Sequence, residues 1–352
     1  MKILLFLPRS NHLKILGPVA VEALGRGHEV RIFIPPGDVK AGSDPPHHRV
    51  AIELPGVVLA DSLQSDWIIA VGLRTGLVER TQTRISGLRW AALDSCGDNL
   101  TYLAEDGEAL RKGWDLVTTF GPGSIGYPEL DQLERADMTR EACRAKWNLP
   151  AGQFVVLLGT AAWPAHLGRL RRCWFEIVRY RRIIASVRRW CEQRGALLIA
   201  KTRAKHRDPS WLGEVCDRVI RDVSFHPFTT LELLRAADFY IGFASAMAIE
   251  TCAVGLQQLH LHGWPPNRSE WPSQRPMKEQ FYMASGGLWN CPASRSASCY
   301  GPSWKYWLDL KALPSEGPLP EDFSAQRRAC ERWVGPVDGK ASARFLDLLE
   351  AC

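Results

Sequence analysis

Short apolar runs alternate with stretches of helical spacing along most of the chain. Residues 3–7 form a continuous apolar run, which a polar loop separates from apolar residues at helical spacing that end near Gly25. A second run, residues 29–34, stops at two prolines. A strand, a helix and a strand in this order predict a β-α-β unit, and the unbroken first strand indicates a parallel sheet covered on both faces.

The rest of the N-terminal half continues this pattern. Further strands are predicted at residues 67–73, 88–93 and 115–120, which together predict a doubly wound domain. Residues 121–152 are polar and contain one predicted helix, from Thr139 as N-cap to Trp147. We interpret this segment as the link between two domains.

A second set of apolar runs begins at Phe154. Predicted strands cover residues 154–159, 196–201, 219–223, 238–241 and 256–261, and predicted helices cover 170–194, 231–236 and 246–253. Residues 264–302 are rich in Pro, Ser and Gly and predict a long loop region. We therefore expect Rossmann-like domains at 1–150 and 151–335 that face each other across a cleft, and a C-terminal helix at 336–352 that packs back on the first domain.

Composition narrows the class of protein. The 352 residues are 46% hydrophobic and 23% charged, as in a folded chain of enzyme size. The 10 cysteines include no C-x-x-C pair, so neither a zinc site nor a disulfide framework is expected. No apolar run approaches the ~20 residues that cross a bilayer, and the first run is too short for a signal peptide. We expect a cytoplasmic protein.

Positive charge gathers in residues 169–189, which include eight Arg, although the net charge is only +6. Ile184 and Val187 have the spacing of a buried helix face, so this segment predicts a surface helix. Its arginines are either solvated or in peripheral contact with anionic lipid at the inner membrane face. The cluster lacks the interleaved aromatics of a nucleic-acid module, so no nucleic-acid partner is expected.

Ligands of doubly wound sheets bind at the carboxyl ends of strands, beside helix N-termini that attract phosphate. The predicted strand 238–241 is followed by Ser245 and Ala246 at a helix start, and Glu250 lies further along that helix. Small residues let a diphosphate approach, Ser245 can donate to it, and the Glu250 carboxylate can hold two ribose hydroxyls. The alternative is an ordinary helix with a Ser cap and a solvent-facing Glu.

Basic residues follow the predicted strand 196–201, where they form a candidate diphosphate site or a solvated loop. They are Lys201, Arg203, Lys205, His206 and Arg207. Thr160, after strand 154–159, is a further candidate donor contact or part of a plain turn.

His12 lies between the first strand and the first helix, where it can act as a general base because its unperturbed pKa of about 6.5 suits proton transfer near neutrality. The alternatives are a His that caps the helix or faces solvent. Asp94, at the end of strand 88–93, is a second candidate base.

Two segments resemble known families. Residues 233–261 resemble the donor-nucleotide motif of GT-B glycosyltransferases, including the CDP-glycerol glycerophosphotransferase-like and UDP-N-acetylglucosamine 2-epimerase-like groups, although many members have Gly or Ser where this chain has Ala246. Residues 11–33 resemble the opening of UDP-glycosyltransferases, in which a His in this loop is catalytic. The resemblance implies phosphate contacts at Ser245 and Ala246, a ribose contact at Glu250, and a segment around Phe228 beside the nucleotide base.

The resemblance implies a transferase that moves a sugar or related group from a nucleotide-activated donor, on the C-terminal domain, to a hydroxyl acceptor on the N-terminal domain. The acceptor is a glycan, a lipid-linked molecule or a small molecule. No metal and no tightly bound cofactor is expected, because helix N-termini and basic side chains can neutralise a leaving diphosphate. The alternatives are a UDP-sugar epimerase of the same fold and a non-catalytic protein that binds nucleotide sugars or glycans.

Overall fold

The computed structural model describes residues 1–35, 54–72, 88–93, 113–118, 123–160, 174–202, 209–242, 247–260, 330–331 and 334–352. Its contacts divide the chain into two compact units. Unit 1 comprises Met1–Arg135, Val223–Phe228 and Glu331–Cys352, and unit 2 comprises Ala136–Asp222 and Thr229–Cys330. A short piece of chain from the second half therefore belongs to unit 1.

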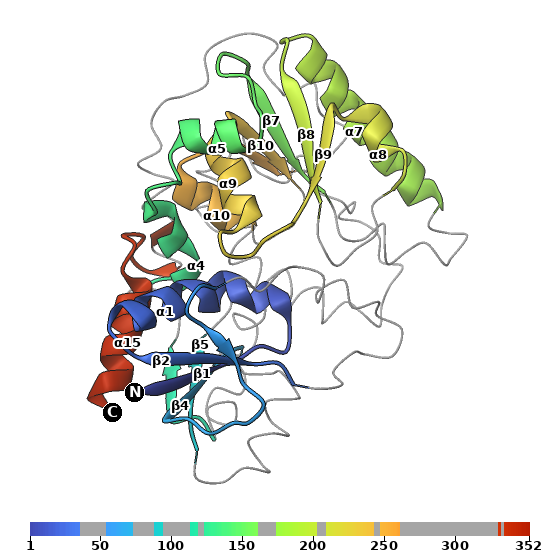
Figure 1. Ribbon diagram of the computed structural model, residues 1–352. Coiled ribbons are helices and arrows are strands. Elements are labelled where there is room, and N and C mark those ends of the chain that lie inside the picture. Colours follow the sequence, from blue (N-terminus) through green and yellow to red (C-terminus); the bar gives the residue numbers. More distant parts are fainter. Residues whose placement is uncertain are drawn as a thin grey trace. The chain divides into compact units, whose positions relative to one another are not determined.

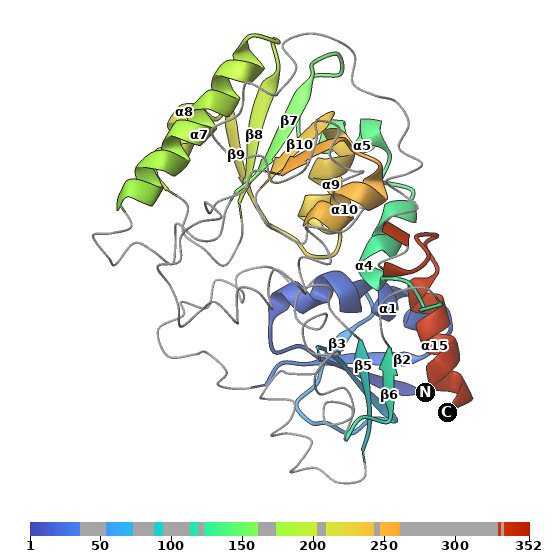
Figure 2. The same ribbon diagram turned by 180° about the vertical axis from the view of Figure 1, so that it is seen from behind.

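Unit 1 contains a parallel sheet whose described strands have the order β3-β2-β1-β4-β5-β6 (Figures 1 and 2). The strands are β1 (Lys2–Phe6), β2 (Glu29–Phe33), β3 (Val58–Leu59), β4 (Trp67–Val71), β5 (Arg89–Leu93) and β6 (Leu116–Thr118). Strand order reverses between β1 and β4, as in a doubly wound fold. The predicted parallel sheet is confirmed.

Both faces of this sheet are covered because its central strands are apolar throughout. On one face the ring of Phe6 lies 5.9 Å from Phe33 and 5.8 Å from Trp90 between centroids. Helix α1 (Leu13–Gly25) packs against β2 and β4, and α15 (Ala341–Ala351) packs against α1. Figure 1 shows α15 beside α1.

Helix α15 is held at both of its ends. At its start, Asp131 of α4 (Pro128–Asp131) accepts hydrogen bonds from the backbone N–H groups of Ala341 and Ser342, at 3.1 and 2.7 Å. Near its end, Arg26 pairs with Asp347 at 2.7 Å. Residues more than 200 positions apart thus join the chain's C-terminus to unit 1.

Unit 2 contains a second parallel sheet, with the order β11-β10-β7-β8-β9 among its described strands. They are β7 (Val155–Gly159), β8 (Leu197–Thr202), β9 (Arg218–Arg221), β10 (Phe239–Gly242) and β11 (Gln258–His260). Strand order reverses between β7 and β10. This sheet too is doubly wound, so the predicted α/β class with two Rossmann-like domains is confirmed.

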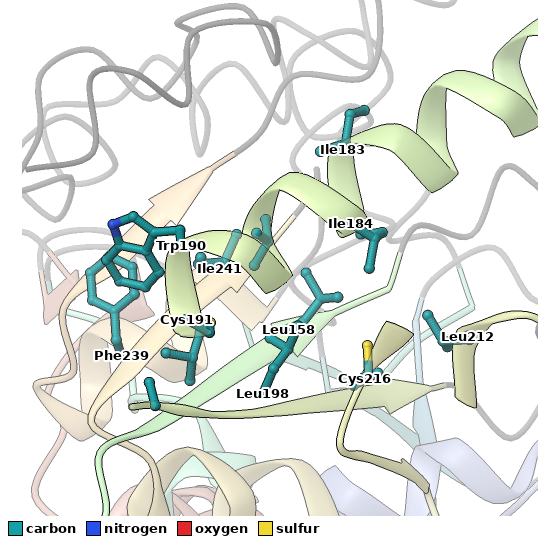
Figure 3. Close-up of a cluster of buried hydrophobic side chains, with 14 of the residues drawn as sticks. Leu158, Ile183, Ile184, Trp190, Cys191, Leu198, Leu212, Cys216, Phe239 and Ile241 are labelled. Carbon is teal, nitrogen blue, oxygen red and sulfur yellow. The ribbon is translucent and has the colours of Figure 1, made fainter. Parts of the chain in front are cut away.

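Helices lie on opposite faces of the second sheet in Figure 1. One face carries α7 (Trp174–Glu192) and α8 (Leu212–Val215), and the other carries α5 (Arg140–Lys146), α9 (Thr229–Ala236) and α10 (Met247–Val254). Figure 3 shows the core under α7, where Trp190 lies beside Phe239 with ring centroids 5.7 Å apart. The predicted burial of Ile184 and Val187 is confirmed.

The arginines of α7 are partly paired with acidic side chains of unit 2. Arg181 pairs with Glu214 at 2.8 Å, and Arg188 pairs with Glu192 at 2.7 Å and with Asp217. These pairs offset part of the positive charge of the described part of the helix, and contact of this helix with anionic lipid stays a prediction.

Arg144 fixes the segment that leads into β7. Its guanidinium donates to the carbonyls of Pro150, Ala151 and Gln153 at 2.9, 2.8 and 3.1 Å and pairs with Asp238 at 2.6 Å. The helix that carries Arg144 begins as predicted, because the backbone N–H of Ala142 donates to the Thr139 hydroxyl at 3.2 Å.

Three features differ from the sequence-based expectations. Residues 121–152 contain α4 and the 3-10 turn η3 (Gln132–Glu134) in addition to the predicted helix. Strand β9 ends at Arg221, and Val223, which is 59% exposed, begins the piece that belongs to unit 1. The two-residue edge strand β3 was not predicted. Residues 264–302, the predicted loop region, lie outside the described residues.

Candidate functional site

Among the described strands, each sheet has one point at which strand order reverses, between β1 and β4 in unit 1 and between β7 and β10 in unit 2. Ligands of doubly wound folds bind at such points. In unit 2, β7 leads to Thr160, and α10, which follows β10 in the chain, carries Glu250. In unit 1, β1 leads into the loop that contains His12. Thr160, Glu250 and His12 therefore each lie in a segment that follows a strand at a point where strand order reverses.

Glu250 is buried, with only 3% of its surface exposed, in the first turn of α10. Its position near a helix N-terminus favours a negative charge, because the free N–H groups there carry partial positive charge. Its burial excludes the alternative of a solvent-facing Glu. A ribose contact by this carboxylate stays a prediction.

Thr160 joins β7 to the neighbouring strand. Both its backbone N–H and its hydroxyl donate to the carbonyl of Lys201, at 3.1 and 3.2 Å. Thr160 is therefore buried and continues the pairing of β7 with β8 at the carboxyl end of these strands, so it is not part of a plain surface turn. The donor contact predicted for Thr160 is not tested by these bonds.

Lys201 lies at the carboxyl end of β8 in a buried polar cluster. Its ammonium donates to a carboxylate oxygen of Asp222 at 2.8 Å, and the Thr230 hydroxyl donates to the other oxygen at 3.3 Å. The two charged side chains are 5% and 6% exposed. Burial excludes the alternative of a solvated lysine, and a phosphate contact by Lys201 stays a prediction that must accommodate its bond to Asp222.

The next residue, Thr202, is fully buried at the end of β8. Among the described residues its hydroxyl has no hydrogen-bond partner. A buried hydroxyl normally has a partner, since leaving one unsatisfied costs free energy. Thr202 is thus a further candidate contact for a bound polar ligand.

Two glycines at the reversal point of unit 2 make room for an aromatic ring. Gly159 and Gly242 are register partners at the ends of β7 and β10. A Cβ on Gly159 would lie 2.5 Å from the hydroxyl of Tyr240, and a Cβ on Gly242 would meet the same group. These glycines therefore serve the packing of Tyr240, a role that the sequence analysis did not foresee.

His12 is 5% exposed and forms the N-cap of α1, preceded by the 3-10 turn η1 (Ser10–His12). Its backbone N–H donates to the carbonyl of Arg9 at 3.0 Å, but its side chain makes no capping hydrogen bond. The burial excludes a solvent-facing His, and a role of His12 as general base stays a prediction. The buried Ser10 hydroxyl beside it has no hydrogen-bond partner among the described residues.

Phe228, predicted to lie in a segment beside a nucleotide base, belongs to unit 1. It is buried, its ring lies 6.0 Å from that of Phe225, and the Lys14 ammonium is 5.2 Å from its centroid. Lys14 also pairs at 2.7 Å with the buried carboxylate of Glu129. These contacts account for the burial of Phe228 within unit 1 and leave the predicted base contact untested.

The remaining predicted site residues lie outside the described part of the chain. They are Asp94, Arg203, Lys205, His206, Arg207, Ser245 and Ala246. Within the described ranges, no group of three His, Cys, Asp or Glu side chains could hold a metal ion. No helix in those ranges is long and apolar enough to cross a membrane.

Asp222 and Gln132 are two buried polar residues that the sequence analysis missed. Lys201 ends the predicted strand 196–201 and Asp222 lies near the end of the predicted strand 219–223, so opposite charges at the ends of two successive predicted strands were an available signal for their pairing. Gln132, in η3, had no comparable local signal.

No protein-family model and no curated protein matches this chain in sequence. Solved structures do match it in fold. The wall teichoic acid polymerase TagF is 12% identical, with a TM-score of 0.59 over 99% of this chain and 88% of that one. UGT89C1 of Arabidopsis thaliana complexed with UDP is 11% identical (TM-score 0.54; 99% and 98% covered). The UDP-GlcNAc 2-epimerase of Methanocaldococcus jannaschii is 13% identical (TM-score 0.51; all of both chains covered).

These neighbours are enzymes of the GT-B type, with activities that include both transfer and epimerisation. Identities of 11–13% carry the fold and nothing finer. The two doubly wound units and the comparisons together show that this chain has the GT-B fold.

Proposed function

We propose that this protein is a glycosyltransferase, which moves a sugar or a related group from a nucleotide-activated donor to a hydroxyl acceptor. The observation that carries the proposal is the buried Glu250 carboxylate in the first turn of α10, the helix that follows β10 in the chain, and β10 lies where the strand order of unit 2 reverses. A buried carboxylate cannot contribute to an apolar core, and its two oxygens can accept hydrogen bonds from the two hydroxyls of a ribose.

The fold neighbours support a nucleotide donor. UGT89C1 was solved with UDP, and a TagF variant with a TM-score of 0.61 to this chain was soaked with CDPG. We propose that unit 2 binds the donor. Ser245 and Ala246 at the helix start would meet the diphosphate, together with Thr160, Lys201, Arg203, Lys205 and His206.

In the proposed reaction the acceptor hydroxyl oxygen bonds to the transferred carbon and the nucleoside diphosphate leaves with the bonding electron pair. His12 of unit 1 takes the hydroxyl proton, which an imidazole nitrogen can accept as a general base. Asp94 is the second candidate for this role. Backbone and basic groups of unit 2 stabilise the charge of the leaving diphosphate.

The second candidate function is epimerisation of a nucleotide sugar. It is favoured by the UDP-GlcNAc 2-epimerase that matches this chain over the whole length of both proteins. An epimerase would bind the same donor but convert it without an acceptor.

Thermal unfolding against a panel of nucleoside diphosphates and nucleotide sugars tests the donor site. A ligand at 100 times its Kd stabilises a fold by about 2.7 kcal/mol, which raises the Tm measurably. We expect a selective rise with one base, and its loss in Glu250→Ala. The matched control is Glu214→Ala, an exposed glutamate on α8, which should keep the rise.

The product then separates the two activities. Release of nucleoside diphosphate that depends on an added hydroxyl acceptor supports transfer, whereas a new sugar epimer without acceptor supports epimerisation. If no nucleotide or nucleotide sugar raises the Tm, the proposed donor site is wrong.

A further inference from the structure

Helix α1 contains a proline at a position where it changes the hydrogen bonding of the helix start. Pro18 lies within the helix, which begins at Leu13. In an α-helix the N–H of residue 18 would donate to the carbonyl of residue 14, but proline has no N–H. The helix itself therefore supplies no bond from position 18 to the carbonyl of Lys14, two residues after His12.

Gln132 supplies a donor to that carbonyl from another part of unit 1. Its side-chain N–H donates to the Lys14 carbonyl oxygen at 2.9 Å, although the two residues are 118 positions apart. Gln132 is 1% exposed, so its amide is shielded from water that would compete for the bond. The bond also satisfies the buried amide of Gln132, which would cost free energy if it were left without an acceptor.

The same amide also holds the piece of the second half that belongs to unit 1. The backbone N–H of Phe228 donates to the Gln132 side-chain oxygen at 2.9 Å, and the Gln132 N–H reaches the Phe225 carbonyl at 3.5 Å. Phe225 and Phe228 form an antiparallel bridge that closes a tight turn. Gln132 thus binds both ends of the turn at residues 225–228.

The residue before Pro18 receives the tip of this turn. A Cβ on Gly17 would lie 2.6 Å from Cδ2 and 2.9 Å from Cβ of His226. The absence of a side chain at Gly17 lets the His226 ring lie against the helix. Gly17 and Pro18 are adjacent in α1 and have different effects. Gly17 leaves space for the His226 side chain, and Pro18 lacks the N–H that would donate to the Lys14 carbonyl, to which Gln132 donates.

We propose that Gln132 is a positioning residue that holds the His12 segment and the turn at residues 225–228 in one fixed arrangement. His12 is the N-cap of α1, so a donor to the Lys14 carbonyl steadies the first turn beside it. One side chain of unit 1 therefore steadies both the segment with the candidate base and the turn at residues 225–228. The link to catalysis rests on the proposed function, whereas the positioning itself does not.

The test compares Gln132→Glu with the double variant Pro18→Ala/Gln132→Glu. Glutamate keeps an oxygen for Phe228 but loses the amide N–H, and the Pro18→Ala change gives the helix back an N–H for the Lys14 carbonyl. We expect Gln132→Glu to lower the Tm by about 2–8 °C and to shift the ring resonance of His12 in the ¹H–¹³C NMR spectrum, assigned with His12→Gln. The double variant should return that resonance toward its native position.

A buried glutamine of unit 2 provides the matched control. Gln258 is fully buried and donates to the Cys252 sulfur at 3.0 Å. Gln258→Glu should also lower the Tm, yet leave the His12 resonance in place. Should Gln132→Glu fail to fold, Gln132→Asn withdraws the same amide by one methylene and takes its place. An unshifted His12 resonance in the folded Gln132 variant overturns the positioning role.

Kinetics separate this inference from the proposed function. With the donor found by thermal unfolding, Gln132→Glu should lower kcat by about 10- to 100-fold, since small misplacements of a reacting group have effects of this size, and leave the donor Kd within about twofold. A shifted His12 resonance with full turnover in His12→Ala supports the positioning role and refutes His12 as the base. Lost turnover in His12→Ala together with an unshifted His12 resonance in Gln132→Glu supports His12 as the base and refutes the positioning role of Gln132.

Discussion

The side chain of His226 occupies the space that a side chain on Gly17 would need. A Cβ on Gly17 would lie within 3 Å of three atoms of the His226 side chain, and the nearest is 2.6 Å away. The glycine is inside α1, where glycine lowers helix stability by roughly 1 kcal/mol relative to alanine. The fit of His226 against the helix is a physical reason for glycine at this position.

Gly17→Ala should lower the free energy of unfolding even though alanine favours a helix. Overpacking costs about 1–3 kcal/mol, which exceeds the helix-propensity gain of about 1 kcal/mol. Gly25→Ala in the same helix is the control, because nothing lies within 4 Å of its Cβ position, and it should be neutral or slightly stabilising. Urea unfolding measures both. Equal stabilities for the two variants would contradict the fit of His226.

The buried pair of Lys201 and Asp222 should be strongly coupled. Removal of one partner leaves a buried charge, which costs about 3–5 kcal/mol. Lys201→Met and Asp222→Asn should therefore each be destabilising, and the double variant should lose less than the sum of the two, which urea unfolding of all four chains would measure. Arg181→Met, which breaks an exposed pair with Glu214, should cost no more than about 1 kcal/mol. Additive losses at Lys201 and Asp222 would argue against the coupling.

We expect Asp217 to stabilise the fold near neutral pH and to lose this contribution in acid. Burial raises the pKa of its carboxyl, but the hydrogen bonds from Arg188 and from the backbone N–H of Leu198 outweigh burial, so the pKa lies below its ordinary value. A group with a lowered pKa contributes stability above its unfolded pKa of about 3.9, and loses it as pH falls through the folded value. Urea unfolding from pH 7 to pH 3 should show the native chain losing its advantage over Asp217→Asn. A pH-independent difference would refute this.

Asp131 should have the opposite pH dependence. Burial raises the pKa of its carboxyl, and the hydrogen bonds from Ser342 and Ala341 only partly offset that effect. A raised pKa means that the contribution is complete below about pH 3.9 and is lost as pH rises through the folded value. The native chain should therefore lose stability relative to Asp131→Asn as pH rises from about 3 toward neutrality. The same unfolding series checks it, and a native chain that gains on the variant with rising pH would contradict the assignment.

Much of the fold follows from local pattern. The run at residues 3–7 predicts a strand buried on both faces, and β1 has that environment because a parallel sheet places helices or loops on each face. Thr139 predicts a helix start, and its hydroxyl does accept from the backbone N–H of Ala142. The strand and the helix start each depend on only a few neighbouring residues. Burial of apolar side chains favours the strand, and the unsatisfied N–H groups of a helix N-terminus favour a capping residue such as Thr139.

Local sequence patterns did not predict the burial or the partners of the candidate-site residues. Glu250 and His12 were identified from their places after strands, but spacing alone left open whether they face solvent, which only their burial decided. The pairing of Lys201 with Asp222 depends on β8 and β9 being neighbours in the sheet. That neighbourhood is a property of the folded chain.

The sequence by itself therefore determined the two doubly wound α/β units and the segments that follow their strands, because apolar periodicity and capping act over one or two turns of chain. Only the tertiary structure decided that residues 223–228 belong to unit 1 and that Gln132 donates to the Lys14 carbonyl. The physical reason is separation along the chain. The sequence shows that Pro18 lacks the N–H of a helical residue. It does not show which group donates to the Lys14 carbonyl instead, because Gln132 is 118 positions away and only the packing of unit 1 brings the two together.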